Sequence, residues 1–180
     1  MGMASSREEL NLNFKKLQRE GKLKNYQFTG DTLLKYTGRT ADLVLPNCFS
    51  EIAEGAFEGN RFLRRVTIPD SYITIGAKAF FGCKSLKTVE FGERVYRIDN
   101  SAFSNCGIWH LVITTGITSV GNLSFSENEQ LRIIEIESNN VWFEKDTFRG
   151  CRGVELLKMP KKLMIGEIGL DLDSIDIEYT

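Results

Sequence analysis

Hydrophobic and polar positions along this chain follow a pattern that returns every 22 or 23 residues. Its clearest markers are phenylalanines spaced 23, 23, 22 and 23 residues apart, at Phe57, Phe80, Phe103, Phe125 and Phe148. Their surroundings are alike, as in the runs GAFEG at 55–59 and KAFFG at 78–82. A fixed period of this length is typical of solenoids, in which each repeat buries its apolar face against its neighbours.

Two further patterns keep the same period. The unit L-x-x-V-x-I places apolar residues as a strand with one buried face does. It occurs at Leu63, Val66, Ile68; Leu86, Val89, Phe91; Ile108, Leu111, Ile113; Leu131, Ile134, Ile136; and Val154, Leu157, Met159. A single apolar residue also recurs, at Ile52, Ile75, Ile98, Val120 and Phe143. We therefore expect each coil to contain a short strand, a turn, a second extended arc and a tight helical or 3₁₀ turn that drives the phenylalanine into the core.

The prolines test this register independently. The chain has 3 of them, and Pro46, Pro69 and Pro160 each follow the last apolar residue of such a unit. Proline has no backbone N–H and cannot continue a hydrogen-bonded ladder, so it belongs where a strand ends.

The predicted fold is an α/β repeat, a right-handed solenoid with parallel strands and short helical turns. Coils start near residues 40, 63, 86, 108, 131 and 154, the last one truncated, with a final strand near 172. We expect two parts, an N-terminal capping helix and hairpin over 1–39 and the solenoid over 40–180. Stacking supplies the buried surface that one coil lacks.

The ends of a solenoid need caps. A helix is predicted over 6–20, because serines at 5 and 6 precede glutamates in a capping-box pattern and Leu10, Phe14 and Leu17 share one face. Gly21 is placed to end it. We interpret this helix as a cap on the first coil, with a partner-binding or membrane-surface helix as the alternative.

Two short extended segments complete the predicted ends. Near the N-terminus, residues 26–28 and 33–36 flank the turn sequence Thr-Gly-Asp and predict a hairpin. At the C-terminus, Leu172, Ile175 and Ile177 repeat the strand unit and predict the final strand.

The segments LRRVTIPDSYITIGAKAFFGCKS and LKTVEFGERVYRIDNSAFSNC resemble the BspA-like, treponemal-type leucine-rich-repeat family. The family pattern is L-x-x-V-x-I-P-x-x-V-x-x-I-G-x-x-A-F-x-G-C, and the likeness covers about residues 43–165. The chain departs from it at Asn128, which stands where the family has cysteine, and at Val141-Trp142-Phe143, where the spacing differs. The resemblance implies a non-catalytic interaction module, and in that family such repeats often lie on cell surfaces and bind host proteins.

Composition narrows the classes of partner. The chain is 42% hydrophobic and 26% charged, and its net charge is −1. It has no global basic field for nucleic acid, and no stretch approaches the roughly 18 apolar residues that span a bilayer. The polar start lacks the pattern of a secretory signal. The compartment is left open between the cytoplasm and, after removal of a leader, the cell surface.

Candidate chemistry is sparse. Cys83, Cys106 and Cys151 share one coil position, which favours small buried residues in the turn; a disulfide between the first two is the alternative. Zinc is disfavoured because no C-x-x-C occurs. The single histidine, His110, is expected to point outward with no nucleophile beside it. We expect no enzyme activity, catalytic residue, metal or cofactor.

The outward positions of the strand units are the best binding candidates. In the middle and late coils they become apolar and include a tryptophan, which is enriched in binding hot spots. The predicted partner-binding residues are Arg65, Trp109, His110, Val112, Ile133, Glu135 and Leu156. The predicted function is a non-catalytic module that binds a protein partner through this face. The alternatives are a scaffold or self-association domain of a larger protein, and a cell-surface adhesin-type domain.

Overall fold

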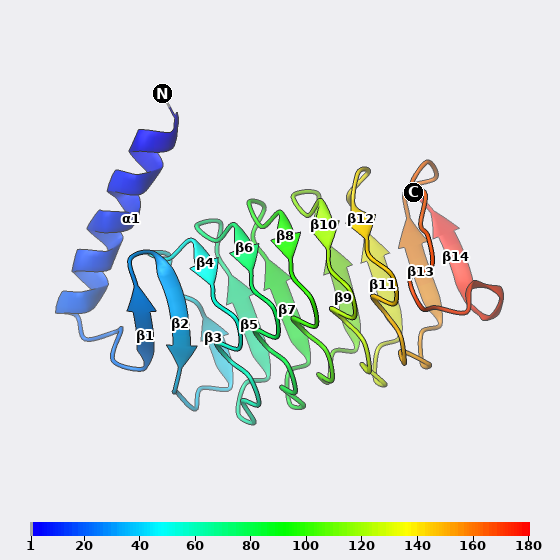
Figure 1. Cartoon of the computed structure of the whole chain (residues 1–180), viewed down its shortest axis with the longest axis horizontal. Coiled ribbons are helices and arrows are strands. Elements are labelled where there is room, and N and C mark those ends of the chain that lie inside the picture. Colours follow the sequence, from blue (N-terminus) through cyan, green and yellow to red (C-terminus); the bar gives the residue numbers. More distant parts are fainter. Residues whose placement is uncertain (1) are drawn as a thin grey trace.

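The computed structural model describes residues 2–180, and they wind into an elongated stack of coils with α1 (Gly2–Arg19) at one end and β14 (Asp176–Tyr179) at the other (Figure 1). Along one side run the strands of the repeated unit: β3 (Asp42–Val44), β5 (Arg65–Ile68), β7 (Thr88–Phe91), β9 (His110–Ile113), β11 (Ile133–Ile136), β13 (Leu156–Met159) and β14. We call their outward side the strand face. A 3₁₀ turn, η1 (Leu172–Ser174), leads into β14.

A second sheet forms the other side of the coils. It contains the hairpin β1 (Tyr26–Thr29) and β2 (Thr32–Tyr36), then β4 (Glu51–Ile52), β6 (Thr74–Ile75), β8 (Arg97–Ile98), β10 (Ser119–Val120) and β12 (Trp142–Phe143). The even-numbered strands from β2 to β12 pair in parallel, each with its equivalent in the next coil. The predicted parallel solenoid and hairpin are confirmed. A final strand forms, but it starts at Asp176 and not near 172, and Ile177 pairs with Leu157 where the repeat pattern expected Ile175.

The phenylalanines of the repeat form a continuous stack between the two sheets. We call Phe57, Phe80, Phe103, Phe125 and Phe148 the phenylalanine ladder; all are at most 1% exposed. Neighbouring rings lie 4.5, 4.9, 5.4 and 5.7 Å apart between centroids, and no pair is tilted by more than 14°. Such stacking adds about 0.5–1.5 kcal/mol per pair to the gain from burial.

The turns that carry the ladder differ from the expected helical turns. Within one turn, Lys78 and Gly82 adopt positive φ angles of 54° and 70°, which interrupts any helix. Alternate N–H groups then point along the solenoid axis: Lys78 donates to Asn100 O at 3.0 Å and Phe80 donates to Ala102 O at 2.7 Å. The turn backbone thus binds the next coil, whereas a helical turn would satisfy its donors internally.

A column of Cys and Asn side chains, which we call the polar column, hydrogen-bonds each turn to the turn of the preceding coil. The thiols of Cys83, Cys106 and Cys151 donate to the carbonyls of Phe57, Phe80 and Phe125 at 3.1–3.2 Å. Asn128, which stands where the family has cysteine, donates to Phe103 O at 2.9 Å. All 4 cysteines are free and buried, so the Cys83–Cys106 disulfide is not formed.

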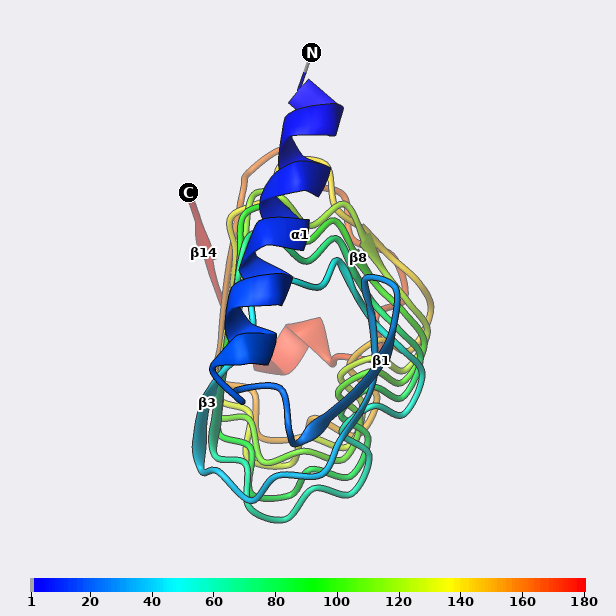
Figure 2. The same cartoon turned by 90° about the vertical axis from the view of Figure 1, so that its left-hand side faces the viewer.

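The N-terminal helix packs on the first coil. The ring of Phe14 lies 5.1 Å from that of Phe28 and 6.5 Å from that of Phe49, and α1 crosses the open end of the coils (Figure 2). At its C-terminus, Lys22 donates to Leu17 O and Gly21 has a φ of 66°, the left-handed geometry that ends helices. The predicted start was wrong: the helix begins at Gly2, so positions 5 and 6 lie within it and not at its start.

The strand face is divided between β7 and β9. Strands β3, β5 and β7 form one sheet, and β9, β11, β13 and β14 form another. The division falls at the 22-residue spacing, where Gly107 alone occupies the place of Lys84 and Ser85 in the coil before. One residue fewer between the turn and the strand breaks the register there, although Gly107 still donates to Leu86 O at 3.1 Å.

Replacement of one ladder ring tests the register. We expect Phe80→Ala to lower the free energy of unfolding by about 3–5 kcal/mol, because it leaves a cavity between two stacked neighbours. Phe62→Ala is the control, because Phe62 is 47% exposed, and it should cost little. Chemical denaturation measures both. A loss below about 1 kcal/mol for Phe80→Ala would contradict the fold described here.

Ionisation of the buried Cys151 thiol should make the protein less stable at alkaline pH. Burial raises the pKa of the Cys151 thiol to about 12, whereas the thiol in the unfolded chain ionises near its ordinary pKa of 9.0. The unfolded state therefore loses a proton first, and stability should fall above about pH 9 by up to about 1.4 kcal/mol per pH unit for this group. In the variant Cys151→Asn, which copies Asn128, the free energy of unfolding should fall less steeply with pH. Chemical denaturation from pH 7 to 10.5 measures this slope. Identical slopes would show that the thiol is accessible.

Candidate partner-binding face

Outward side chains of the late strands form two rows across the sheet. Strand register places them beside one another from β9 to β14. One row is His110, Ile133, Leu156 and Asp176, and the other is Val112, Glu135, Lys158 and Glu178. We call these two rows, together with Trp109, the late strand face.

A chain of polar contacts runs across this face. The Nε2 atom of His110 lies 3.2 Å from Oε1 of Glu135, and Nζ of Lys158 lies 3.6 Å from the same oxygen. Lys158 also approaches Glu178 at 3.9 Å. The first three side chains are 31–34% exposed. Partly exposed pairs of this kind contribute only up to about 1 kcal/mol each, so their main effect is to hold the side chains in defined positions.

Apolar groups lie beside this polar chain. Trp109 is 49% exposed, and its ring centroid lies 5.5 Å from that of His110. Ile133 and Leu156 are half-buried and adjacent in the register. An exposed indole next to fixed aliphatic and charged groups forms a surface whose burial by a partner is favourable.

The structure brings together most of the residues predicted to form the site. Register aligns His110, Val112, Ile133, Glu135 and Leu156 on the late strand face, and the ring of Trp109 lies beside that of His110. Arg65 lies apart, on β5, where it pairs with Thr88 of β7 and approaches Asp42 at 3.9 Å. The division between β7 and β9 separates it from the others.

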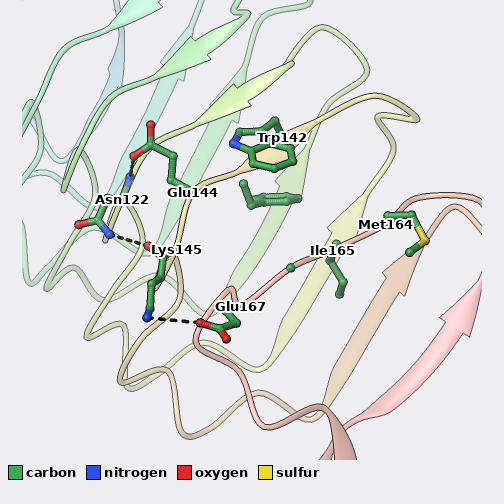
Figure 3. A pocket seen from close by; sticks show the side chains of 9 residues that line it. Asn122, Trp142, Glu144, Lys145, Met164, Ile165 and Glu167 are labelled. Atoms are coloured by element: carbon green, nitrogen blue, oxygen red, sulfur yellow. Dashed lines mark hydrogen bonds and ion pairs between the residues drawn. The ribbon is translucent and has the colours of Figure 1, made fainter.

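Sequence reasoning missed an apolar groove at the end of the second sheet. It has a volume of about 590 Å³ and lies between β12 and residues 164–167, with Trp142 and Met164 71% and 89% exposed (Figure 3). Lys145 and Glu167 form an ion pair across it at 3.3 Å. The signal was Trp142 itself, because register places its indole in the column where Arg97 and Ser119 stand in the preceding coils.

Other chemistry finds little support in the described part of the chain. Over residues 2–180, no three His, Cys, Asp or Glu side chains converge as a metal site would require. Within the same range, no serine or cysteine hydrogen-bonds to His110. The helix of the described region is too polar to cross a membrane.

Comparison with known proteins points to one repeat family. A family model described as "BspA type Leucine rich repeat region" matches residues 22–169 in 6 copies. A search of curated proteins finds no match.

Solved structures share the fold. A leucine-rich-repeat protein of T. pallidum, TpLRR, is 28% identical and superposes with a TM-score of 0.70 over 75% of this chain and 69% of that one. A leucine-rich-repeat protein from Bacteroides capillosus is 24% identical, with a TM-score of 0.53 over 63% of this chain and 99% of that one. The pneumococcal vaccine antigen PcpA is 20% identical, with a TM-score of 0.63 over 77% of this chain and 42% of that one.

The exposure of Trp109 leads to a stability prediction. Trp109→Ala should change the free energy of unfolding by less than about 1 kcal/mol, since half of the indole already faces solvent. Leu111→Ala, two residues along and 1% exposed, should cost about 2–5 kcal/mol. Thermal or urea denaturation of the two variants compares them directly. A large loss for Trp109→Ala would make the indole part of the core and remove it from the binding face.

Proposed function

The chain belongs to the BspA-type leucine-rich-repeat family, and on this premise we propose that it is a non-catalytic module that binds a protein partner through the late strand face. The observation that carries the proposal is the alignment, on adjacent parallel strands, of an aliphatic pair and a charged row, with an exposed indole immediately before β9. Proteins of this family are generally interaction modules rather than enzymes, which agrees with this reading.

The geometry suits a flat, folded surface better than a small ligand. The strands hold their outward side chains at fixed spacings, about 4.8 Å between strands and two residues apart along each. A partner that covers Trp109 and the Ile133–Leu156 pair would bury the apolar groups, while the row from Glu135 to Glu178 would set its orientation. We propose Arg65 as an outlying contact for a partner that spans the division between β7 and β9.

Self-association is the second candidate. Its support is that β14 ends the late sheet with an unpaired edge, and edge strands pair readily with other chains. Asp176 and Glu178 point out from that strand, however, and their charge would oppose the joining of two identical edges. We therefore favour a heterologous partner.

Affinity capture from source-cell and host lysates tests the proposal. The bait is the wild type, and the test variant is Trp109→Ala with Ile133→Ser. Tyr96→Ala is the matched control, because Tyr96 is a 43% exposed aromatic residue that precedes β8 on the other sheet. We expect one protein to be retained by the wild type and by the control, and to be lost with the folded double variant.

Two results would contradict the proposal. Equal capture by all three baits would move the contact off the late strand face. Capture of nothing, together with concentration-dependent dimers in light scattering, would favour self-association. Circular dichroism of each bait establishes that a loss of capture is not a loss of folding.

A further inference from the structure

The second sheet ends at β12 with backbone groups that the next coil does not use. In the preceding coils, a carbonyl at one fixed position accepts an N–H from the coil that follows. The bonds are Gly76 N to Ile52 O, Asp99 N to Ile75 O, Gly121 N to Ile98 O and Glu144 N to Val120 O, all at 2.8–2.9 Å. No N–H of residues 160–170 donates to the equivalent carbonyl of Phe143.

The carbonyl two residues earlier is in the same state. Thr118 O accepts from Trp142 N at 2.9 Å, whereas the equivalent Val141 O receives no N–H from residues 160–170. Backbone hydrogen bonds between these two coils resume only where Asp146 N donates to Glu167 O at 3.0 Å and Phe148 N donates to Ile168 O at 2.8 Å. Between these points the chain stands away from β12 and leaves the groove of Figure 3. One strand is therefore missing from an otherwise continuous sheet.

The two open sheet edges of the C-terminal end differ in character. The strand β14 points Asp176 and Glu178 outward, and charges of this kind protect an edge from pairing. The edge at β12 instead carries Trp142, with Met164 on the opposite wall of the groove. Only the second edge combines unpaired backbone acceptors with an apolar trough.

Charge indicates what would fit there. Lys145 is neutralised by Glu167, whereas Glu144 forms no ion pair among the described residues, although its Oε2 accepts the Asn122 N–H at 3.0 Å. The groove thus keeps one negative charge beside an exposed indole. A guanidinium or ammonium group is attracted to both, to the carboxylate by charge and to the indole face by a cation–π contact.

We propose that this groove binds an extended peptide segment of a partner protein, which adds a strand beside β12 and places a basic side chain over Trp142. An aliphatic residue next to the basic one would lie beside Phe143 and Ile165. Strand addition of this type obtains affinity from backbone hydrogen bonds and specificity from alternate side chains. The site is separate from the late strand face, so each stands without the other.

The chain itself supplies the probe. Strand register aligns Arg97 of β8 with Ser119 of β10 and with Trp142 of β12. The next residue, Ile98, is aligned in the same way with Phe143. A blocked synthetic peptide with the sequence of residues 95–99, Val-Tyr-Arg-Ile-Asp, therefore carries the basic and aliphatic side chains in the required order. It is titrated into the isotope-labelled full chain and followed by amide NMR shifts.

We expect saturable shifts confined to residues 141–145 and 164–167 at peptide concentrations up to about 1 mM, as for a small contact area. Trp142→Ala should weaken binding about tenfold, a change of about 1.4 kcal/mol. Trp109→Ala, the exposed tryptophan of the other face, should leave it unchanged. Glu in place of the peptide's arginine should also weaken binding about tenfold.

Backbone donation separates strand addition from simple apolar contact. The same peptide with N-methyl groups on its arginine and aspartate keeps every side chain but loses two N–H donors, and it should not bind. Equal binding of the N-methylated peptide, equal binding to Trp142→Ala, or no shifts around the groove would overturn the proposal. Shifts in the same residues on raising the concentration of the chain alone would assign the groove to a second copy and would also overturn it.

Discussion

The stacking of one phenylalanine on the next sets the geometry of this molecule. Rings of the ladder are nearly parallel and lie about one coil apart, so each coil presents the next with the same shape. Because the ring must arrive at the same place each time, the path length between rings is almost constant. The strands on either side are then brought into register, and alternate side chains are left to point outward. The proposed binding face is made of those outward positions, which the ladder fixes but does not use.

Much of this was predictable because burial in a solenoid is periodic. The ladder, the strand units, the recurring apolar column and the exposure of Trp109 all follow from counting residues. What failed depends on local backbone geometry: the turns with left-handed residues four positions apart, and the helix that runs past the serines to Gly2. The division of the strand face at Gly107 was visible only as a spacing of 22, whose effect on pairing no pattern revealed.

The groove beside β12 shows where periodic reasoning stops. A repeat pattern predicts what each coil does when the next coil copies it, but residues 160–170 lack the A-F turn and no longer do so. The consequences are unused carbonyls at Val141 and Phe143, and they require coordinates to be seen. The end of the repeat thus produces a second type of surface, a sheet edge, beside the flat face made by the regular coils.

Site-specific photo-crosslinking in source cells tests most directly whether the late strand face is the contact surface. A benzoylphenylalanine at Val112, which lies within that face, is compared with one at Tyr96, which is exposed immediately before β8 of the other sheet. The account predicts a discrete adduct of higher mass from the first position and none from the second. Adducts from position 96 alone, or from neither position while the chain is folded and present, would contradict it.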